Sequence, residues 1–559
     1  MADFLVTTLA DEDNGATNGM SLREAIQLAN SNGNAGIEDV ITFASDLAGQ
    51  TITLTEGPLV ITDDLRIDGD ALGDTTGKET GRADDITITT AIIENFASQV
   101  AVTPAGYTSP GTVTLEEAIG TFGDFRIFEV RQDGTDAAFN ALTLTGAGVY
   151  TGGNPFPGYG QMGAAIYQAD FEAGTTGTLP DDSAFSFTWD EEAGDLDLAV
   201  KTTVAVTHST ISDNYGTAIV AGHRFTMEDS VLSGNHGGFA AGIFIAALEG
   251  EATLRDVHVK DHDLISARAT LGTGAPGGDF IVENSEITNN RMVDTDVGGV
   301  LLNTGAGVFF SGSPGGGISI TDSVVKDNQG ILAGAIATGS PDQDITVKNS
   351  VFENNIARGD WLASFGGGAI AVAAVGADVY VEGSSFVDNK NVANGGGAFA
   401  IGGTSNIFEI VNSTLTGNVS GKSGGAIGFQ GTSNKIALVN STVVDNHIVE
   451  NPITDLNGLT PASPDAIATA IGLFPEFGST GGLFNFLSYE RFASNGGDNQ
   501  TGIENSIIAG NTNLGVASDV HFELGWGDAI DFLTEIGVRF DPNTGRSFVD
   551  TSLIFIETL

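Results

Sequence analysis

The chain has 559 residues, and its 72 acidic against 21 basic residues give a formal net charge of −51. This excess of carboxylates excludes nucleic acid and anionic membrane surfaces as partners, because both require clustered lysine and arginine. The 78 glycines argue against long helices, which glycine destabilises. Because the chain has no cysteine, disulfides and thiolate metal sites are excluded as well.

No run of about 18 apolar residues is present, so we expect no transmembrane segment. The start of the chain, Met1–Val6, lacks the basic and apolar stretches of a secretory signal peptide. The acidic, glycine-rich, cysteine-free composition resembles that of proteins exported by type I secretion. We therefore expect an extracellular or cell-surface protein that is exported without a cleaved N-terminal signal.

Residues 1–70 contain a short amphipathic helix. Ser21 and Glu24 have the spacing of a capping box, and the residues that follow place Leu22, Ala25 and Ile26 on one apolar face. Such a helix would cover the open end of a stack of strands, whose exposed edges otherwise favour aggregation. The sequence thus predicts a capping helix followed by the first coils of a solenoid.

Four segments in this region carry a family resemblance: Phe4–Asp11, Ser21–Ile26, Asp39–Phe43 and Ile52–Leu54. They resemble the N-terminal region of CSLREA-type bacterial secreted and surface β-helix proteins. Met20 stands where that family usually has cysteine. The resemblance implies a parallel β-helix outside the cell.

Acidic residues cluster at several places in the first 200 residues. Because carboxylates repel one another unless cations screen them, we expect calcium as a cofactor. Residues 71–200 otherwise predict strand-rich coils with large loops. The candidate calcium ligands are Asp11, Asp13, Asp68, Asp70, Asp190, Glu192, Asp195 and Asp197.

A repeat of the form Ser-x-apolar-x-x-Asn dominates residues 201–450 and returns once near the C-terminus. Successive asparagines from Asn328 to Asn446 are 27, 34, 29 and 28 residues apart, which is the spacing of stacked solenoid coils. We expect an all-β, right-handed parallel β-helix. Its asparagines are Asn214, Asn235, Asn290, Asn328, Asn355, Asn389, Asn418, Asn446 and Asn511, each five residues after a serine.

Turn chemistry explains most of this repeat. The residue before each asparagine is Asp, Asn or Gly, the types that tolerate a left-handed backbone. The asparagine side chains are expected to hydrogen-bond up the stack, as amide ladders do in other stacked parallel strands. Gly-Gly-Ala-Ile segments, such as Gly424–Ile427, turn the chain and let the next strand pack closely.

The Gly-Gly-Ala-Ile and Phe-x-x-Asn segments also resemble the repeats of polymorphic outer-membrane proteins and related adhesins. Phe352–Asn355 with Gly367–Ile370, and Phe386–Asn389 with Gly396–Phe399, carry the resemblance. It implies a β-helix with an adhesive role at the cell surface.

An enzyme acting on polysaccharide is the alternative, because a lyase or epimerase needs a base, an acid and a cation in one place. Asp256, His258 and Lys260 would share one face of a strand and are the candidate catalytic residues. Against this, His262 aligns with the repeated turn asparagine and Asp261 with the residue before it. A hydrolase dyad among Asp327, Asp388 and Asp445 is also conceivable, although turn chemistry explains these residues better. We favour a non-enzymatic role.

Two apolar segments suggest self-association. Residues 451–500 form an aromatic-rich insertion, which either packs along the flank of the β-helix or offers an aromatic contact surface, and residues 501–559 contain the closing coils and an apolar C-terminal strand. Together they predict a structural or adhesive protein that assembles into filaments or a surface layer with calcium, in contact with glycan or cell surface. A phage or virus fibre would be a trimer, and no heptad stalk supports it. The candidate contact residues are Phe474, Phe477, Leu553, Ile554, Phe555 and Ile556.

Overall fold

A computed structural model describes most of the repeat region and both flanks. The described residues are 1–33, 36–73, 85–90, 126–131, 134–148, 164–168, 202–237, 240–247, 249–265, 269–274, 276–293, 305–311, 314–358, 366–392, 395–421, 424–429, 433–448, 483–486, 500–509, 511–513, 516–517, 520–523, 538–541 and 546–549. They divide into two compact units, Met1–Asn303 and Thr304–Leu559, which we describe in turn. The unit boundary falls inside residues 201–450, the segment predicted as one run of repeats.

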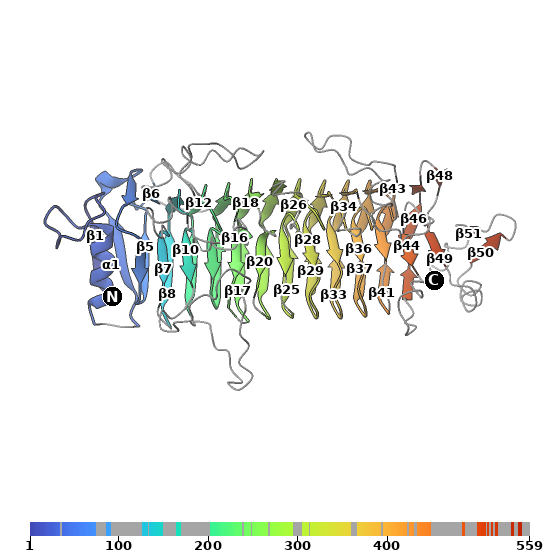
Figure 1. Ribbon diagram of the computed structural model, residues 1–559, viewed down its shortest axis with the longest axis horizontal. Coiled ribbons are helices and arrows are strands. Elements are labelled where there is room, and N and C mark those ends of the chain that lie inside the picture. Colours follow the sequence, from blue (N-terminus) through green and yellow to red (C-terminus); the bar gives the residue numbers. More distant parts are fainter. Residues whose placement is uncertain are drawn as a thin grey trace, which may run out of the picture. The chain divides into compact units, whose positions relative to one another are not determined.

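Each unit is a stack of coils in which successive strands join successive sheets. In each coil the chain passes through sheet one, turns into sheet two and returns through sheet four (Figure 1). From Asp263 onward, a strand of the short sheet three follows the turn at the ladder residue, between sheets two and four. Strands next to one another within these four sheets are parallel, apart from the pair β47 (Thr512–Asn513) and β48 (Val516–Ala517). The predicted right-handed parallel β-helix is confirmed.

In Met1–Asn303, each sheet orders its strands as follows. Sheet one holds β1 (Asp3–Val6), β2 (Asp39–Phe43), β5 (Leu65–Asp68), β8 (Asp136–Asn140), β11 (Thr203–Thr207), β14 (Arg224–Glu228), β17 (Glu251–Arg255) and β21 (Asp279–Glu283). Sheet two holds β3 (Thr51–Leu54), β6 (Ile86–Thr90), β9 (Leu142–Thr145), β12 (Thr210–Ser212), β15 (Val231–Ser233), β18 (His258–Lys260) and β22 (Glu286–Thr288). Sheet three holds β19 (Asp263–Ile265) and β23 (Arg291–Val293), and sheet four holds β4 (Leu59–Ile61), β7 (Phe128–Val130), β10 (Ile166–Gln168), β13 (Ile219–Ala221), β16 (Ala240–Ile245) and β20 (Ala269–Thr273).

In Thr304–Leu559, the same order continues. Sheet one holds β25 (Gly317–Thr321), β29 (Asp344–Lys348), β33 (Asp378–Glu382), β37 (Ile407–Val411), β41 (Lys435–Val439) and β45 (Gln500–Glu504). Sheet two holds β26 (Val324–Lys326), β30 (Val351–Glu353), β34 (Ser385–Val387), β38 (Thr414–Thr416), β42 (Thr442–Val444) and β46 (Ile507–Ala509). Sheet three holds β27 (Gln329–Gly330), β31 (Ile356–Ala357), β35 (Lys390–Asn391), β39 (Val419–Ser420), β43 (His447–Ile448), β47 and β48, and sheet four holds β24 (Phe309–Ser311), β28 (Ile336–Thr338), β32 (Ile370–Val372), β36 (Phe399–Ile401), β40 (Ile427–Phe429), β44 (Leu483–Phe486) and β49 (Val520–Glu523). A hairpin of β50 (Val538–Asp541) and β51 (Arg546–Val549) follows.

The single helix of the described residues, α1 (Leu22–Ser31), caps the N-terminal unit, where a one-turn 3-10 helix (Ser45–Leu47) also lies. The Ser21 hydroxyl accepts from the Glu24 amide, and the Glu24 carboxylate accepts from the Ser21 amide, as the capping box predicts. Burial alone would raise the pKa of Glu24, but the N–H groups of Ser21, Ala16 and Asn14 hold it below its usual value. The apolar face of α1 packs against β1, β2 and β4, so the predicted capping helix is confirmed.

The buried asparagines form a ladder in each unit, and in the N-terminal unit His262 occupies one position between Asn235 and Asn290. In the C-terminal unit the backbone N–H of Asn355 donates to Oδ1 of Asn389 at 3.0 Å, and that of Asn389 donates to Asn418 at 3.0 Å. The amide nitrogen of Asn389 also donates to the Phe352 carbonyl, 2.9 Å away on the preceding coil. The buried polar groups of each corner therefore find their hydrogen-bond partners in the neighbouring coils, as buried polar groups must. The predicted amide ladder is confirmed.

A second ladder is made by the serines of the repeat, for which sequence analysis gave no role. The N–H of Ser350 donates to Oγ of Ser384, and the N–H of Ser384 donates to Oγ of Ser413, both at 3.1 Å. Each hydroxyl in turn donates to a carbonyl two residues earlier, as Ser384 does to Glu382 at 2.8 Å. Serine suits this corner because one hydroxyl both accepts and donates.

The Gly-Gly-Ala corner is the most tightly packed part of the coil. A Cβ atom at Gly368 would overlap the carbonyl oxygen of Gly397, and one at Gly397 would overlap that of Gly425. Their φ angles are not positive, so close approach and not backbone conformation requires glycine here.

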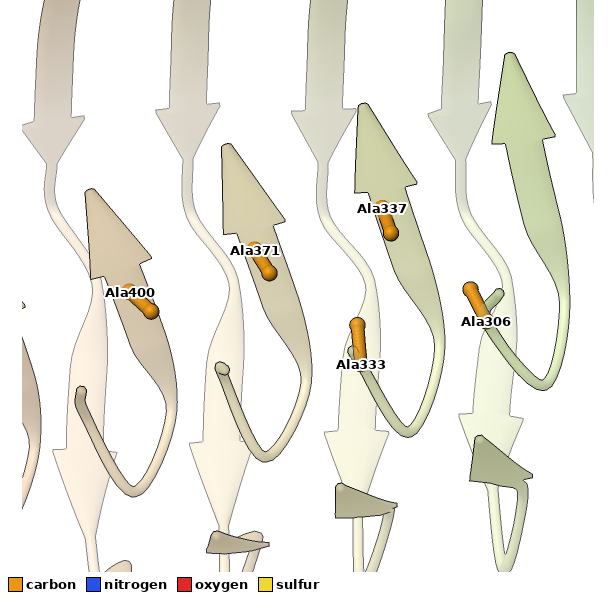
Figure 2. Close-up of a cluster of buried hydrophobic side chains, with 5 residues drawn as sticks. All are labelled: Ala306, Ala333, Ala337, Ala371 and Ala400. Atoms are coloured by element: carbon orange, nitrogen blue, oxygen red, sulfur yellow. The ribbon is translucent and has the colours of Figure 1, made fainter. Parts of the chain in front are cut away.

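Small side chains also line sheet four next to this corner. Figure 2 shows Ala337, Ala371 and Ala400 on the successive strands β28, β32 and β36, with Ala333 at the turn before β28 and Ala306 at the turn before β24. Ala337 pairs with Ala371, and Ala371 with Ala400. All five are at most 4% exposed. The inner side chains on either side of these strand alanines, such as Ile370 and Phe399, fill the core.

We predict that Gly368→Ala lowers the free energy of unfolding by about 2 kcal/mol or more, because the added methyl group must displace the backbone of the next coil. Urea unfolding of the intact chain measures this. Gly339→Ala is the matched control, since a Cβ atom there has nothing within 4 Å. Equal stability of the two variants would contradict the close-approach explanation.

Candidate functional site

Five of the seven histidines of the chain lie on neighbouring coils of the N-terminal unit, within residues 208–262. Three of them face a carboxylate of the next coil. The nitrogen-to-oxygen distances are 4.0 Å for His208 to Asp229, 3.7 Å for His236 to Asp263 and 3.4 Å for His258 to Glu286. This clustering makes the outer surface from β11 to β23 the candidate site.

The predicted catalytic residues lie close together, but one of them is not on the strand. His258 and Lys260 face outward from β18, while Val259 between them points into the core. Asp256 precedes the strand in a turn with φ of 55°, so the prediction that it shares their face is wrong. Aspartate tolerates this left-handed conformation, and its carboxylate accepts from the side chain of Asn284. The side chain is therefore engaged in a turn.

The neighbouring arginine bridges three coils. Arg255 lies in register between Glu228 and Glu283, and its guanidinium contacts their carboxylates at 2.7 and 2.6 Å. Hydrogen bonds to Glu283 and Glu228 raise the pKa of Arg255 above its usual value. All three side chains are nearly half exposed, so each pair contributes little to stability. The guanidinium of Arg255 thus links two carboxylates on the neighbouring coils.

His262 takes the place of an asparagine in the ladder, as the repeat alignment predicts. Its Nδ1 accepts from the N–H of Asn235 at 3.1 Å, and its Nε2 lies 3.1 Å from the Leu232 carbonyl. These partners assign the proton to Nε2, which donates as the amide nitrogen of asparagine does elsewhere. Burial lowers the pKa of His262 to about 4, so the ring is neutral at physiological pH.

A row of outward side chains follows the ladder and was missed by sequence analysis. Tyr215, His236, Asp263 and Arg291 each come directly after a ladder residue and pair in successive coils. The rings of Tyr215 and His236 lie 5.2 Å apart, and Arg291 lies 3.6 Å from the Asp263 carboxylate. Comparing the residue after each ladder position, coil by coil, would have found this row.

The proposed hydrolase dyad is not formed on adjacent coils. Asp327 and Asp388 have φ of 58° and 53° in equivalent turns, but Asn354 lies between them in the stack. Gly417 likewise separates Asp388 from Asp445. The side chain of Asn354 donates to Asp327 at 2.6 Å. Alternation with neutral residues keeps stacked carboxylates from repelling one another at the strand spacing of about 4.8 Å.

The candidate calcium ligands at the N-terminus have other partners. Asp11 forms a two-pronged salt bridge with Arg23 at 2.7 and 3.1 Å and accepts from the backbone of Thr55 and Glu56. Burial would raise the pKa of Asp11, but these bonds lower it. Asp13 accepts from Gln27 at 3.1 Å.

The next acidic pair is engaged as well. Asp68 accepts from Arg66, Asn140 and the N–H of Asp70 at 2.8, 2.8 and 3.2 Å. Among the described residues, no group of three or more histidine, aspartate or glutamate side chains is placed to hold a metal ion. Calcium binding remains a prediction.

The other predicted site residues lie outside the described residues. They are Asp190, Glu192, Asp195, Asp197, Phe474, Phe477, Leu553, Ile554, Phe555 and Ile556. In the part of the chain that the structure describes, no helix has the length and apolarity to cross a membrane.

No protein-family model matches the sequence, and no curated protein matches it. Two solved structures are similar over most of the chain. One is the crystal structure of the Dettilon tailspike protein, with 13% identity over 77% of this chain and 70% of that chain and a TM-score of 0.25. The other is DFA-IIIase from Arthrobacter chlorophenolicus A6 in complex with GF2, with 12% identity over 89% and 98% and a TM-score of 0.28. At these values neither similarity bears on the activity of this chain.

We predict that His262 makes the fold sensitive to acid. The pKa of His262 is 6.5 in the unfolded chain and about 4 in the folded chain. The stability that the neutral ring contributes is therefore fully present above pH 6.5. It is lost as pH falls to about 4, because the unfolded chain takes up the proton first. The loss amounts to about 3 kcal/mol. In His262→Asn, which restores the ladder amide, the difference in unfolding free energy between neutral pH and pH near 4 should shrink by that amount.

Urea unfolding at both pH values measures the effect, with His258→Asn on the outer surface as the control. An unchanged pH dependence in His262→Asn would contradict the assignment of a neutral ring.

Proposed function

We propose that this protein is an extracellular or cell-surface structural or adhesive β-helix and not an enzyme. One observation carries the proposal. Around the candidate catalytic residues, the charged side chains form hydrogen bonds and ion pairs with neighbouring coils. Arg255 bridges Glu228 and Glu283, Asp256 is held by Asn284, and His262 is part of the buried ladder. These groups link the stacked coils, which is what a rigid scaffold requires.

The setting outside the cell is supported by sequence. The first 70 residues resemble CSLREA-type secreted and surface proteins, and the Gly-Gly-Ala-Ile repeats resemble those of surface adhesins. The net charge of −51 and the absence of cysteine resemble the composition of proteins exported by type I secretion. Outside the cell, calcium would screen the repulsion between the carboxylates. Contact with glycan or cell surface, and assembly into filaments or a layer, belong to this proposal.

A polysaccharide lyase, epimerase or hydrolase is the second candidate, favoured by one observation. His258 and Lys260 stand on the same outer face of β18, with the His258 side chain 55% exposed and Glu286 3.4 Å from it. A base, a carboxylate and a cation are thus open to solvent together, as proton abstraction next to a uronate carboxylate requires.

We predict that the purified protein depolymerises no acidic or neutral polysaccharide, and that the double variant His258→Ala, Lys260→Ala binds glycan or cells as the natural chain does. Reducing-end and unsaturated-product assays measure the first, and sedimentation with cells measures the second. Lys326→Ala, on the outer face of β26, is the matched control. Cleavage that disappears in the double variant and persists in the control would establish the enzyme instead.

We also predict that calcium promotes assembly, because screening the carboxylates removes the repulsion between copies. Light scattering and electron microscopy should show larger species in millimolar calcium than in chelator. A protein that stays monomeric in both conditions contradicts the self-associating part of the proposal.

A further inference from the structure

The outer face of sheet two in the N-terminal unit carries two parallel columns of hydroxyl side chains. Every second residue of its first strands is threonine, in the pattern Thr-apolar-Thr. We call this surface the threonine array. Its members are Thr51 and Thr53 on β3, Thr87 and Thr89 on β6, and Thr143 and Thr145 on β9.

The strand register aligns these residues from coil to coil. Thr51 pairs with Thr87, Thr53 with Thr89, and Thr87 with Thr143. The columns continue on β12, where Thr210 pairs with Thr143 and Ser212 with Thr145. The hydroxyls therefore repeat in two directions: about 4.8 Å between strands and roughly 6.6 Å between alternate residues of one strand.

The array is rigid, and its side chains are exposed or partly buried. The side chains between the threonines, Ile52, Ile88 and Leu144, are at most 1% exposed and fix each strand to the core. Threonine is β-branched and restricted in its first side-chain torsion, so equivalent positions favour the same orientation. Thr51 and Thr53 are exposed, and the later members are half-buried by their neighbours.

The array is also neutral, which is unusual in a chain with a net charge of −51. No charged residue stands at an outward position of β3, β6, β9 or β12. The first outward His and Lys side chains of sheet two come two coils beyond β12, at His258 and Lys260 of β18. Nor do the array positions contain an aromatic side chain, on which a sugar ring would stack. The surface thus lacks the groups that recognise an anionic or soluble glycan.

We propose that the threonine array binds ice. Its two repeats are close to those of water oxygens in the surface lattice of hexagonal ice. Each threonine offers a hydroxyl that donates and accepts hydrogen bonds with water, beside a methyl group that cannot. A preorganised array holds adjoining waters in lattice positions at little further entropic cost, because the side chains are already fixed. Many weak contacts then sum over a flat surface. This function goes beyond the structural or adhesive role proposed above.

The test is ice-recrystallisation inhibition and thermal hysteresis of the intact, purified protein. The natural chain should inhibit ice recrystallisation. Its thermal hysteresis, the difference between melting and freezing temperatures, should exceed that of serum albumin at equal concentration. Thr89→Tyr and Thr145→Tyr, each near the centre of the array, should reduce both effects several-fold, because the bulky ring breaks the flat surface. Thr226→Tyr, an outward threonine of β14 in sheet one, should leave both effects unchanged.

The melting temperatures of the variants establish that each one is folded. Absence of both effects in the folded natural chain overturns the proposal. Equal loss in Thr226→Tyr and in the array variants also overturns it. Neither result bears on the structural role, whose tests are glycan cleavage and assembly.

Discussion

The whole structure depends on satisfying the backbone polar groups at the buried corners of each coil. A parallel stack has no hairpins, so a corner residue that enters the core must find its hydrogen-bond partner in the coil above or below. Asparagine and serine meet this need because one short side chain accepts from one coil and donates to another. The asparagine at Asn389, for example, bonds to Asn355 and Phe352 on the preceding coil and to Asn418 on the following one.

That constraint explains where the charge of the protein lies. Most carboxylates lie on outward strand positions and in the left-handed turns just outside the ladder, and a buried one such as Asp39 has a polar partner in the N–H of Ala2. Some outward carboxylates pair with a cation of the next coil, as Glu228 and Glu283 do with Arg255, and others stack on a carboxylate, as Glu251 does on Asp279. The threonine array is a neutral surface in an acidic protein, and so suits an uncharged partner.

Much of the fold was predictable because every coil needs the same hydrogen bonds at its corners, and the same residue types therefore recur in the sequence. The Ser-x-apolar-x-x-Asn spacing and the capping box of Ser21 and Glu24 each follow from local hydrogen bonding, and both predictions are confirmed. The site was harder. Asp256 was placed on a strand because alternation alone does not reveal a left-handed residue two positions before the strand begins. Tyr215 and Arg291 are 76 residues apart in sequence and are brought into one row only by the stacking of coils.

The central claim is that the polar side chains of the repeat hold the coils together. Hydrogen–deuterium exchange of the intact chain tests it most directly, because an amide bonded to a ladder side chain exchanges only when coils separate. The account predicts that the amides of Asn355, Asn389 and Asn418 exchange as slowly as those of the strands beside them. Exchange at these corners at the rate of an unstructured peptide would contradict it.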